Sequence, residues 1–152
     1  MTILGLISDT HGMLNERIYE VFAGVDLIVH AGDIGNPTIV WELEYIAPTI
    51  AILGNNDWDI YGDGIDRTAH KTIEGVKTFI THFPREADEA AASGEYGLVI
   101  HGHTHVPRDE IVQGCRVINP GSATRPRGGS QACVAIVEIE DGKIGPVQTI
   151  VL

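Results

Sequence analysis

Five apolar segments of the sequence each lead into a side chain that can bind a metal ion. Together they supply two aspartates, one asparagine and four histidines: Asp9, His11, Asp33, Asn55, His82, His103 and His105. Mixed oxygen and imidazole ligands suit manganese, zinc, iron or nickel, whereas calcium and magnesium prefer oxygen ligands. Seven ligands are too many for one ion and suffice for two if one carboxylate is shared. The set therefore predicts two divalent metal ions, with manganese as the first candidate and zinc, iron or nickel as alternatives.

The spacing of these residues favours convergence. Asp9 and His11 are two positions apart, as are His103 and His105, so in an extended segment each pair leans to the same side. The apolar runs before them have the β-branched character of strands, at Thr2–Ser8, Asp26–His30, Thr49–Leu53, Lys77–Thr81 and Gly97–Ile100. In open α/β sheets, sites form beyond the carboxyl ends of the strands, so the five strand ends are expected to meet.

Helical patterns alternate with these strands. Asn15 can cap a helix whose Ile18 and Phe22 share a face and which stops at Gly24. A second helix is expected after Asn36, because the next residue is a proline, which is favoured in the first turn. The alanine-rich segment Arg85–Ser93 is the third. Trp41, in the second helix, is expected to pack in the core.

The last third of the chain has a different pattern. Strands without intervening helices are predicted at Asp109–Val112, Arg116–Ile118, Cys133–Glu140 and Ile144–Val151. Alternating strands and helices followed by a meander indicate an α/β domain with two packed sheets. A length of 152 residues, with no linker or internal repeat, predicts a single domain over residues 1–152.

Composition narrows the function. The net charge is −11, and a surface this acidic repels a long polyanion, so nucleic acid is disfavoured and a small phosphorylated substrate is favoured. No apolar run approaches the roughly 20 residues that span a bilayer, so no membrane association is expected. The opening residues lack a signal-peptide pattern, and Cys115 and Cys133 form no spaced motif. We therefore expect a cytoplasmic protein with two free thiols; a homo-oligomer is left open.

The order of the motifs resembles that of the calcineurin-like metallophosphoesterases. The motifs are Asp-x-His at Asp9, Gly-Asp at Gly32, Gly-Asn-x-Asp at Gly54, a lone His82 and Gly-His-x-His at Gly102. The runs Gly102–Pro107 and Ile118–Ser122 are similar to those of the small bacterial and archaeal branch, the YfcE-type phosphodiesterases. The resemblance covers about residues 3 to 127. It implies a four-layer αββα sandwich, in which two mixed sheets are flanked by helices.

The resemblance also implies roles for individual residues. It assigns Asp9, His11, Asp33 and His105 to one metal, and Asp33, Asn55, His82 and His103 to the other, with Asp33 shared. It implies that a hydroxide between the two metals hydrolyses a small phosphodiester, since two cations lower the pKa of bound water. The candidate catalytic residues are Asp33, Asn55, Asn56, Asp57 and His103.

Two positions depart from the family pattern. Asn56 stands where the superfamily usually has a histidine that protonates the leaving group, and an amide cannot supply that proton. His82 lies between Thr81 and Phe83, where a glycine neighbour is common in the family.

Other residues have competing interpretations. Asp57 could orient neighbouring groups or serve only in a turn, while His30 and His101 fit hydrogen-bonded core histidines better than ligands. His70 is expected to be an exposed strand residue. Arg125 and Arg127 could clasp a substrate phosphate, although residues 127–130 have the composition of a mobile loop.

Alternative functions on the same fold also remain. They are a phosphomonoesterase, a cyclic-nucleotide phosphodiesterase, a nuclease, and a non-catalytic protein-binding scaffold like the retromer subunit of this fold. A pure scaffold has no need for all seven ligand-type residues, which are present here.

Overall fold

The computed structural model describes residues 1–57 and 64–152. One sheet has five strands in the order β10-β9-β1-β2-β3. Their bounds are β1 Thr2–Ile7, β2 Leu27–His30, β3 Thr49–Ala51, β9 Cys133–Glu140 and β10 Lys143–Val151. β1, β2 and β3 run parallel, while β9 pairs antiparallel with β1, and β10 pairs antiparallel with β9 at the edge of the sheet.

The second sheet also has five strands, in the order β4-β5-β6-β8-β7. Their bounds are β4 Ala69–Ile73, β5 Val76–Ile80, β6 Leu98–Ile100, β7 Arg108–Val112 and β8 Cys115–Asn119. β5, β6 and β8 are parallel to one another, and the edge strands β4 and β7 are antiparallel. Both sheets are therefore mixed.

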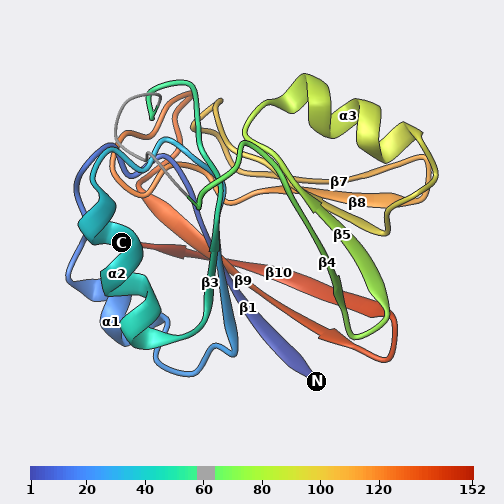
Figure 1. The fold of residues 1–152 in the computed structure, drawn as a ribbon, viewed down its shortest axis with the longest axis horizontal. Helices are drawn as coiled ribbons and strands as arrows, with labels where there is room; N and C mark the ends of the chain where they lie inside the picture. The colour runs from blue at the N-terminus through green and yellow to red at the C-terminus, as the bar shows by residue number, and fades with distance from the viewer. Residues whose placement is uncertain (58–63) are drawn as a thin grey trace.

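The three helices within residues 1–57 and 64–152 lie on the outer faces of the two sheets. They are α1 Arg17–Val21, α2 Pro37–Ile46 and α3 Pro84–Ala92. In Figure 1, α1 and α2 lie on one side, α3 lies on the other, and the two sheets lie between them. Asn36 caps α2 as predicted, because its side chain accepts a hydrogen bond from the backbone N–H of Thr38, at 3.0 Å.

Side-chain alternation along the strands builds the layers. Leu4 and Leu6 of β1 join the cluster between the sheets, whereas Ile7 packs with Ile18 and Phe22 beneath α1. A third cluster joins Ala87 of α3 to the outer face of the second sheet. Helices, sheet, sheet and helix therefore form the four-layer αββα sandwich, and the predicted fold class is confirmed.

Two details differ from the sequence predictions. Trp41 is not a core residue: it is 66% exposed, because Ile39, Val40 and Leu43 supply the buried face of α2. The first helix is also shorter than expected. The Asn15 side chain accepts from the N–H of Arg17, but only residues 17–21 are helical. Among the helices that the structure describes, none combines the length and the apolar character needed to span a membrane.

Strand register brings the ends of the parallel strands level with one another. Ile7 pairs with His30 and His30 pairs with Ala51 in the first sheet. Ile80 pairs with Ile100, and Ile100 with Ile118, in the second. The segments that leave these strands therefore start from one edge of the sandwich.

Candidate metal centre

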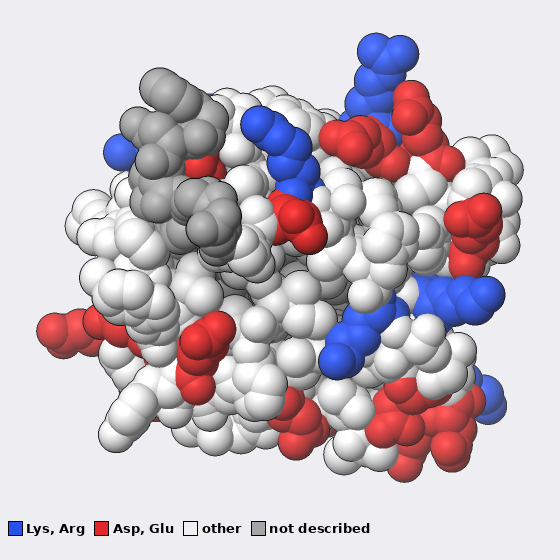
Figure 2. All heavy atoms as spheres, viewed as in Figure 1, with Lys and Arg blue, Asp and Glu red and all other residues white. Residues whose placement is uncertain are grey.

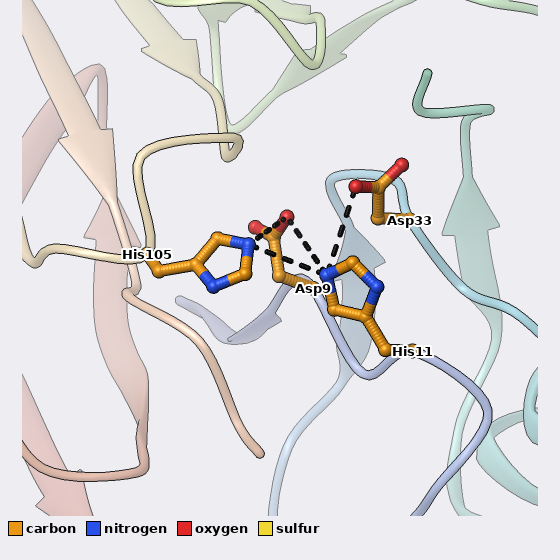
Figure 3. Close-up of side chains that lie close together, drawn as sticks. All are labelled: Asp9, His11, Asp33 and His105. Carbon is orange, nitrogen blue, oxygen red and sulfur yellow. Dashed lines mark hydrogen bonds and ion pairs between the residues drawn. The ribbon is translucent and has the colours of Figure 1, made fainter. Parts of the chain in front are cut away.

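Four residues from three strand ends form a compact donor group. Asp9 and His11 follow β1, Asp33 follows β2, and His105 lies between β6 and β7; their donor atoms all lie within 4.8 Å of one another. His105 Nε2 is 3.2 Å from Asp9 Oδ1, and His11 Nε2 is 3.7 Å from Asp33 Oδ2. Figure 3 shows both imidazoles directing a ring nitrogen towards the Asp9 carboxylate. This is the ligand group that the resemblance assigns to the first metal.

The two carboxylate oxygens of Asp9 have different surroundings. Oδ2 accepts hydrogen bonds from the Ser8 hydroxyl at 2.6 Å and from the backbone N–H of His103 at 3.1 Å. Oδ1 is one of two buried side-chain polar atoms in residues 1–57 and 64–152 without a hydrogen-bond partner. An unpaired buried carboxylate oxygen is costly unless a cation compensates it. With imidazole nitrogens of His11, His82 and His105 within 4 Å, Oδ1 fits a metal ligand.

The backbone turns sharply at the candidate ligands. Asp9, His11, Asp33, His103 and His105 all have positive φ angles, between 47° and 75°. They make up five of the eight non-glycine residues with positive φ in the described part of the chain. Such conformations cost about 1–3 kcal/mol each and concentrate at functional sites. Here they redirect the chain as it leaves each strand and turn the side chains towards a common point.

A second donor group lies beside the first. The side-chain oxygen of Asn55 is 3.1 Å from His82 Nε2 and 3.2 Å from His103 Nδ1. His82 Nε2 is also 3.5 Å from Asp33 Oδ2. The structure thus brings all seven predicted ligands together, with Asp33 between the two groups. Their division between two metals stays a prediction.

Backbone carbonyls orient two of the imidazoles. His82 Nδ1 lies 2.7 Å from the carbonyl of Ala31, and His105 Nδ1 lies 2.6 Å from that of Arg125. A carbonyl only accepts, so Nδ1 carries the proton in each ring, and Nε2 presents its lone pair to the donor group. Outer hydrogen bonds of this kind are usual for histidines that bind metals. They also explain how His82 is oriented without a glycine neighbour.

The surroundings of His11, His103 and Asp33 favour the protonation states that metal ligands need. Burial lowers the pKa of His11 and of His103, so both imidazoles are neutral at neutral pH. Burial opposes ionisation of Asp33, but the nearby His82 imidazole and the two hydrogen bonds from Asn56 outweigh it and hold the pKa of Asp33 well below its usual range. Asp33 is therefore a carboxylate.

Asp57 joins the loops behind the donor group. Its buried carboxylate accepts hydrogen bonds from the backbone N–H groups of Ile34, Gly35 and Gly54, at 2.9 to 3.0 Å. Asp57 is fully buried, and it fixes the loop that carries Asp33. This placement corresponds to the orienting role considered for Asp57.

The other histidines are bound within the protein. His30 Nδ1 accepts from the N–H of Gly32, and burial lowers its pKa to about 3. His101 is buried and accepts from Arg108 at Nε2, and burial lowers its pKa to about 4. Both are core histidines, as predicted. His70 is an exposed residue of β4, also as predicted.

Sequence reasoning missed the support for Asp9 from residues after β8. The hydroxyls of Ser122 and Thr124 donate to the backbone carbonyl of Asp9, at 2.8 and 3.2 Å. These two bonds hold the backbone of Asp9, whose φ angle is 52°. The sequence run Ile118–Ser122 could have pointed to this support, but it was used only as a sign of the family.

The two arginines at the rim are exposed. The positive charge of Arg125 adds to burial in lowering the pKa of His11, so its guanidinium lies within electrostatic range of the donor group. The backbone N–H of Arg127 donates to the carbonyl of His105, at 3.3 Å. A phosphate clasp by either side chain stays a prediction.

Comparisons with known proteins agree with the geometry. A family model described as the calcineurin-like phosphoesterase superfamily domain matches residues 1–142. A phosphodiesterase of Methanocaldococcus jannaschii is 36% identical over 136 residues, covering 78% of this chain and 82% of the relative. The structure of an archaeal phosphodiesterase superposes with a TM-score of 0.82 at 32% identity, covering 99% of both chains.

A further neighbour shows the fold alone. Vps29 from Entamoeba histolytica, solved with zinc, has a TM-score of 0.78 at 17% identity and covers 97% of both chains. The match of the family model over most of the chain, together with the phosphodiesterase relative, decides the family. This chain belongs to the calcineurin-like phosphoesterase superfamily.

Proposed function

We propose that this chain is a phosphodiesterase that hydrolyses small phosphodiesters with two divalent metal ions, manganese first among the candidates. The observation that carries the proposal is the unpaired, buried Oδ1 of Asp9 at the centre of converging imidazoles. Asp9, His11, Asp33 and His105 would hold one ion, and Asp33, Asn55, His82 and His103 the other. When bound, two such ions generate a nucleophile from water near neutral pH and neutralise charge on the phosphate.

The protein's own residues set the geometry for this chemistry. The backbone carbonyls of Ala31 and Arg125 fix two imidazoles, and Ser8 fixes Asp9. His11, His103 and Asn55 are partly or fully exposed, so they border the side from which a phosphate arrives. Arg125 at the rim adds a positive charge that would favour an anionic substrate.

Surface charge supports a small substrate over a nucleic acid. The chain has 21 acidic and 10 basic residues. On the face shown in Figure 2, the Lys and Arg side chains are interspersed with Asp and Glu and do not merge into one basic surface. A nuclease needs a footprint that releases counterions from the phosphate backbone, so small diesters are favoured. A cytoplasmic location and one domain over residues 1–152 remain parts of this proposal, and a homo-oligomer stays open.

The test combines metal analysis with an activity screen. We expect two manganese ions per chain after loading, and fewer in Asp33→Asn, because the shared ligand is weakened. Loaded protein should hydrolyse phosphodiesters faster than phosphomonoesters, and a chelator should abolish the activity. The matched control for His11→Ala is His70→Ala, because His70 is an exposed histidine of β4. This control should keep full metal content.

Each alternative gives a distinct result. Preference for monoesters or cyclic nucleotides would replace the substrate class and keep the metal centre. A protein that is saturated with metal at one ion per chain would refute the two-metal arrangement. Metal binding without hydrolysis of any phosphate ester would favour the scaffold.

A further inference from the structure

Asn56 binds both oxygens of a single carboxylate. Its backbone N–H donates to Asp33 Oδ1 at 2.9 Å, and its side-chain amide donates to Asp33 Oδ2 at 2.8 Å. One residue thus presents two donors to two acceptors, an arrangement comparable to the paired bonds between arginine and a carboxylate. Paired bonds of this kind restrict rotation of the carboxylate as well as its position.

The two bonds leave room for further ligands. Each carboxylate oxygen has two lone pairs, and Asn56 uses one on each. Oδ2 also faces His11 Nε2 at 3.7 Å and His82 Nε2 at 3.5 Å, which belong to different donor groups. Asn56 therefore holds the carboxylate while Oδ2 lies within 4 Å of one histidine of each donor group.

Neighbouring residues fix the loops that Asn56 connects. Asp57 binds the backbone N–H groups of Ile34 and Gly35, directly after Asp33. Gly54 permits the close approach, because a Cβ there would overlap with the carboxylate of Asp33. Adjacent residues thus hold the backbone and the side chain of the Asp33 segment.

We propose that Asn56 is a positioning residue that holds Asp33 in the orientation needed to bind both metal ions. The inference rests on the proposed function, because it concerns the shared ligand of the same centre. It replaces the view of position 56 as only a vacant general-acid position: an amide donates hydrogen bonds but no proton.

The experiment measures manganese affinity by calorimetry for the wild type, Asn56→Ala and Asn56→Leu. Leucine has nearly the shape of asparagine but no donor, so it separates hydrogen bonding from packing. Loss of a hydrogen bond behind a metal ligand typically weakens metal binding about 10–100-fold, and both variants are expected in this range. Asn15→Ala removes another side-chain amide, one that binds the start of α1, and should bind manganese like the wild type.

Thermal unfolding of the metal-free proteins checks that each variant is folded. Weakened manganese binding with an unchanged midpoint supports the positioning role. Wild-type affinity in Asn56→Ala or Asn56→Leu would overturn that role and leave the proposed function intact. A wild type that binds no manganese would overturn the proposed function and the role of Asn56 with it.

Discussion

The Nε2 atoms of His11 and His105 lie 3.3 Å apart, although 94 positions separate the two residues in the sequence. The rings are tilted by 49° and their centroids are 5.1 Å apart, so the contact is between nitrogens and not between ring faces. In His105 the proton is on Nδ1, which donates to Arg125, so its Nε2 can only accept. Two converging nitrogens above a carboxylate favour a cation at the point where they meet.

Manganese is therefore expected to raise the thermal stability of chelator-treated protein. A metal at about 1,000 times its dissociation constant adds about 4 kcal/mol, or roughly 8–16 °C for a chain of this size. His105→Ala should lose most of this gain, whereas His70→Ala should keep it. Differential scanning fluorimetry with and without manganese measures the gain; identical midpoints in the wild type would contradict the prediction.

Hydrolysis is expected to be independent of both cysteines. Cys115 packs against α3 and Cys133 begins β9; both are buried free thiols, and burial raises their pKa. Neither thiol is thus a nucleophile at neutral pH. Cys115→Ala and Cys133→Ala should keep the wild-type kcat/KM at equal metal content, even if they cost about 1 kcal/mol of stability. A folded, metal-loaded variant without activity would refute this.

The position of the donor residues could be predicted because parallel strands end together. Asp9 and Asp33 each follow a strand within three residues, and register makes Ile7 and His30 neighbours. Residue type and distance from a strand end are both visible in the sequence. The same two features indicated that His30, which lies inside a strand and not after its end, is a core residue and not a ligand.

The bonds that orient the donors could not be predicted. His82 is held by the carbonyl of Ala31, which is 51 positions away, and every residue has such a carbonyl. The pairing of Asn56 with Asp33 likewise depends on how two loops meet. Trp41 was misplaced because an aromatic residue fits a buried or an exposed position of an amphipathic helix, and the packing of its neighbours decides.

Acid is expected to destabilise the metal-free protein through His101. Burial lowers the pKa of His101 to about 4 in the fold, against about 6.5 in the unfolded chain, so the unfolded state binds its proton first as pH falls. The contribution of His101 to the free energy of unfolding is complete above about pH 6.5. It falls by about 2 kcal/mol over the next 1.5 pH units below that value.

The comparison of wild type with His101→Gln isolates this group. The variant is needed because His82 has the opposite effect. Asp33 and Asp9 outweigh burial and raise the pKa of His82, so this residue adds to the stability of the folded protein as pH falls. Urea denaturation between about pH 6.5 and about pH 5 should show that the wild type loses about 2 kcal/mol more than the variant. Equal losses would mean that His101 takes up its proton as readily in the fold as in the unfolded chain.

The rate of hydrolysis is expected to depend steeply on the leaving group. A departing alkoxide needs a proton, whereas a nitrophenolate leaves without one. The side-chain amide of Asn56 is bonded to Asp33 and has no ionisable proton to give. General acid catalysis contributes about 10²–10⁴-fold, so alkyl diesters should be slower than aryl diesters by at least this factor. The measurement is kcat/KM of the wild type over a series of aryl and alkyl phosphodiesters at constant metal. A shallow dependence on leaving-group pKa would show that another group protonates the leaving oxygen.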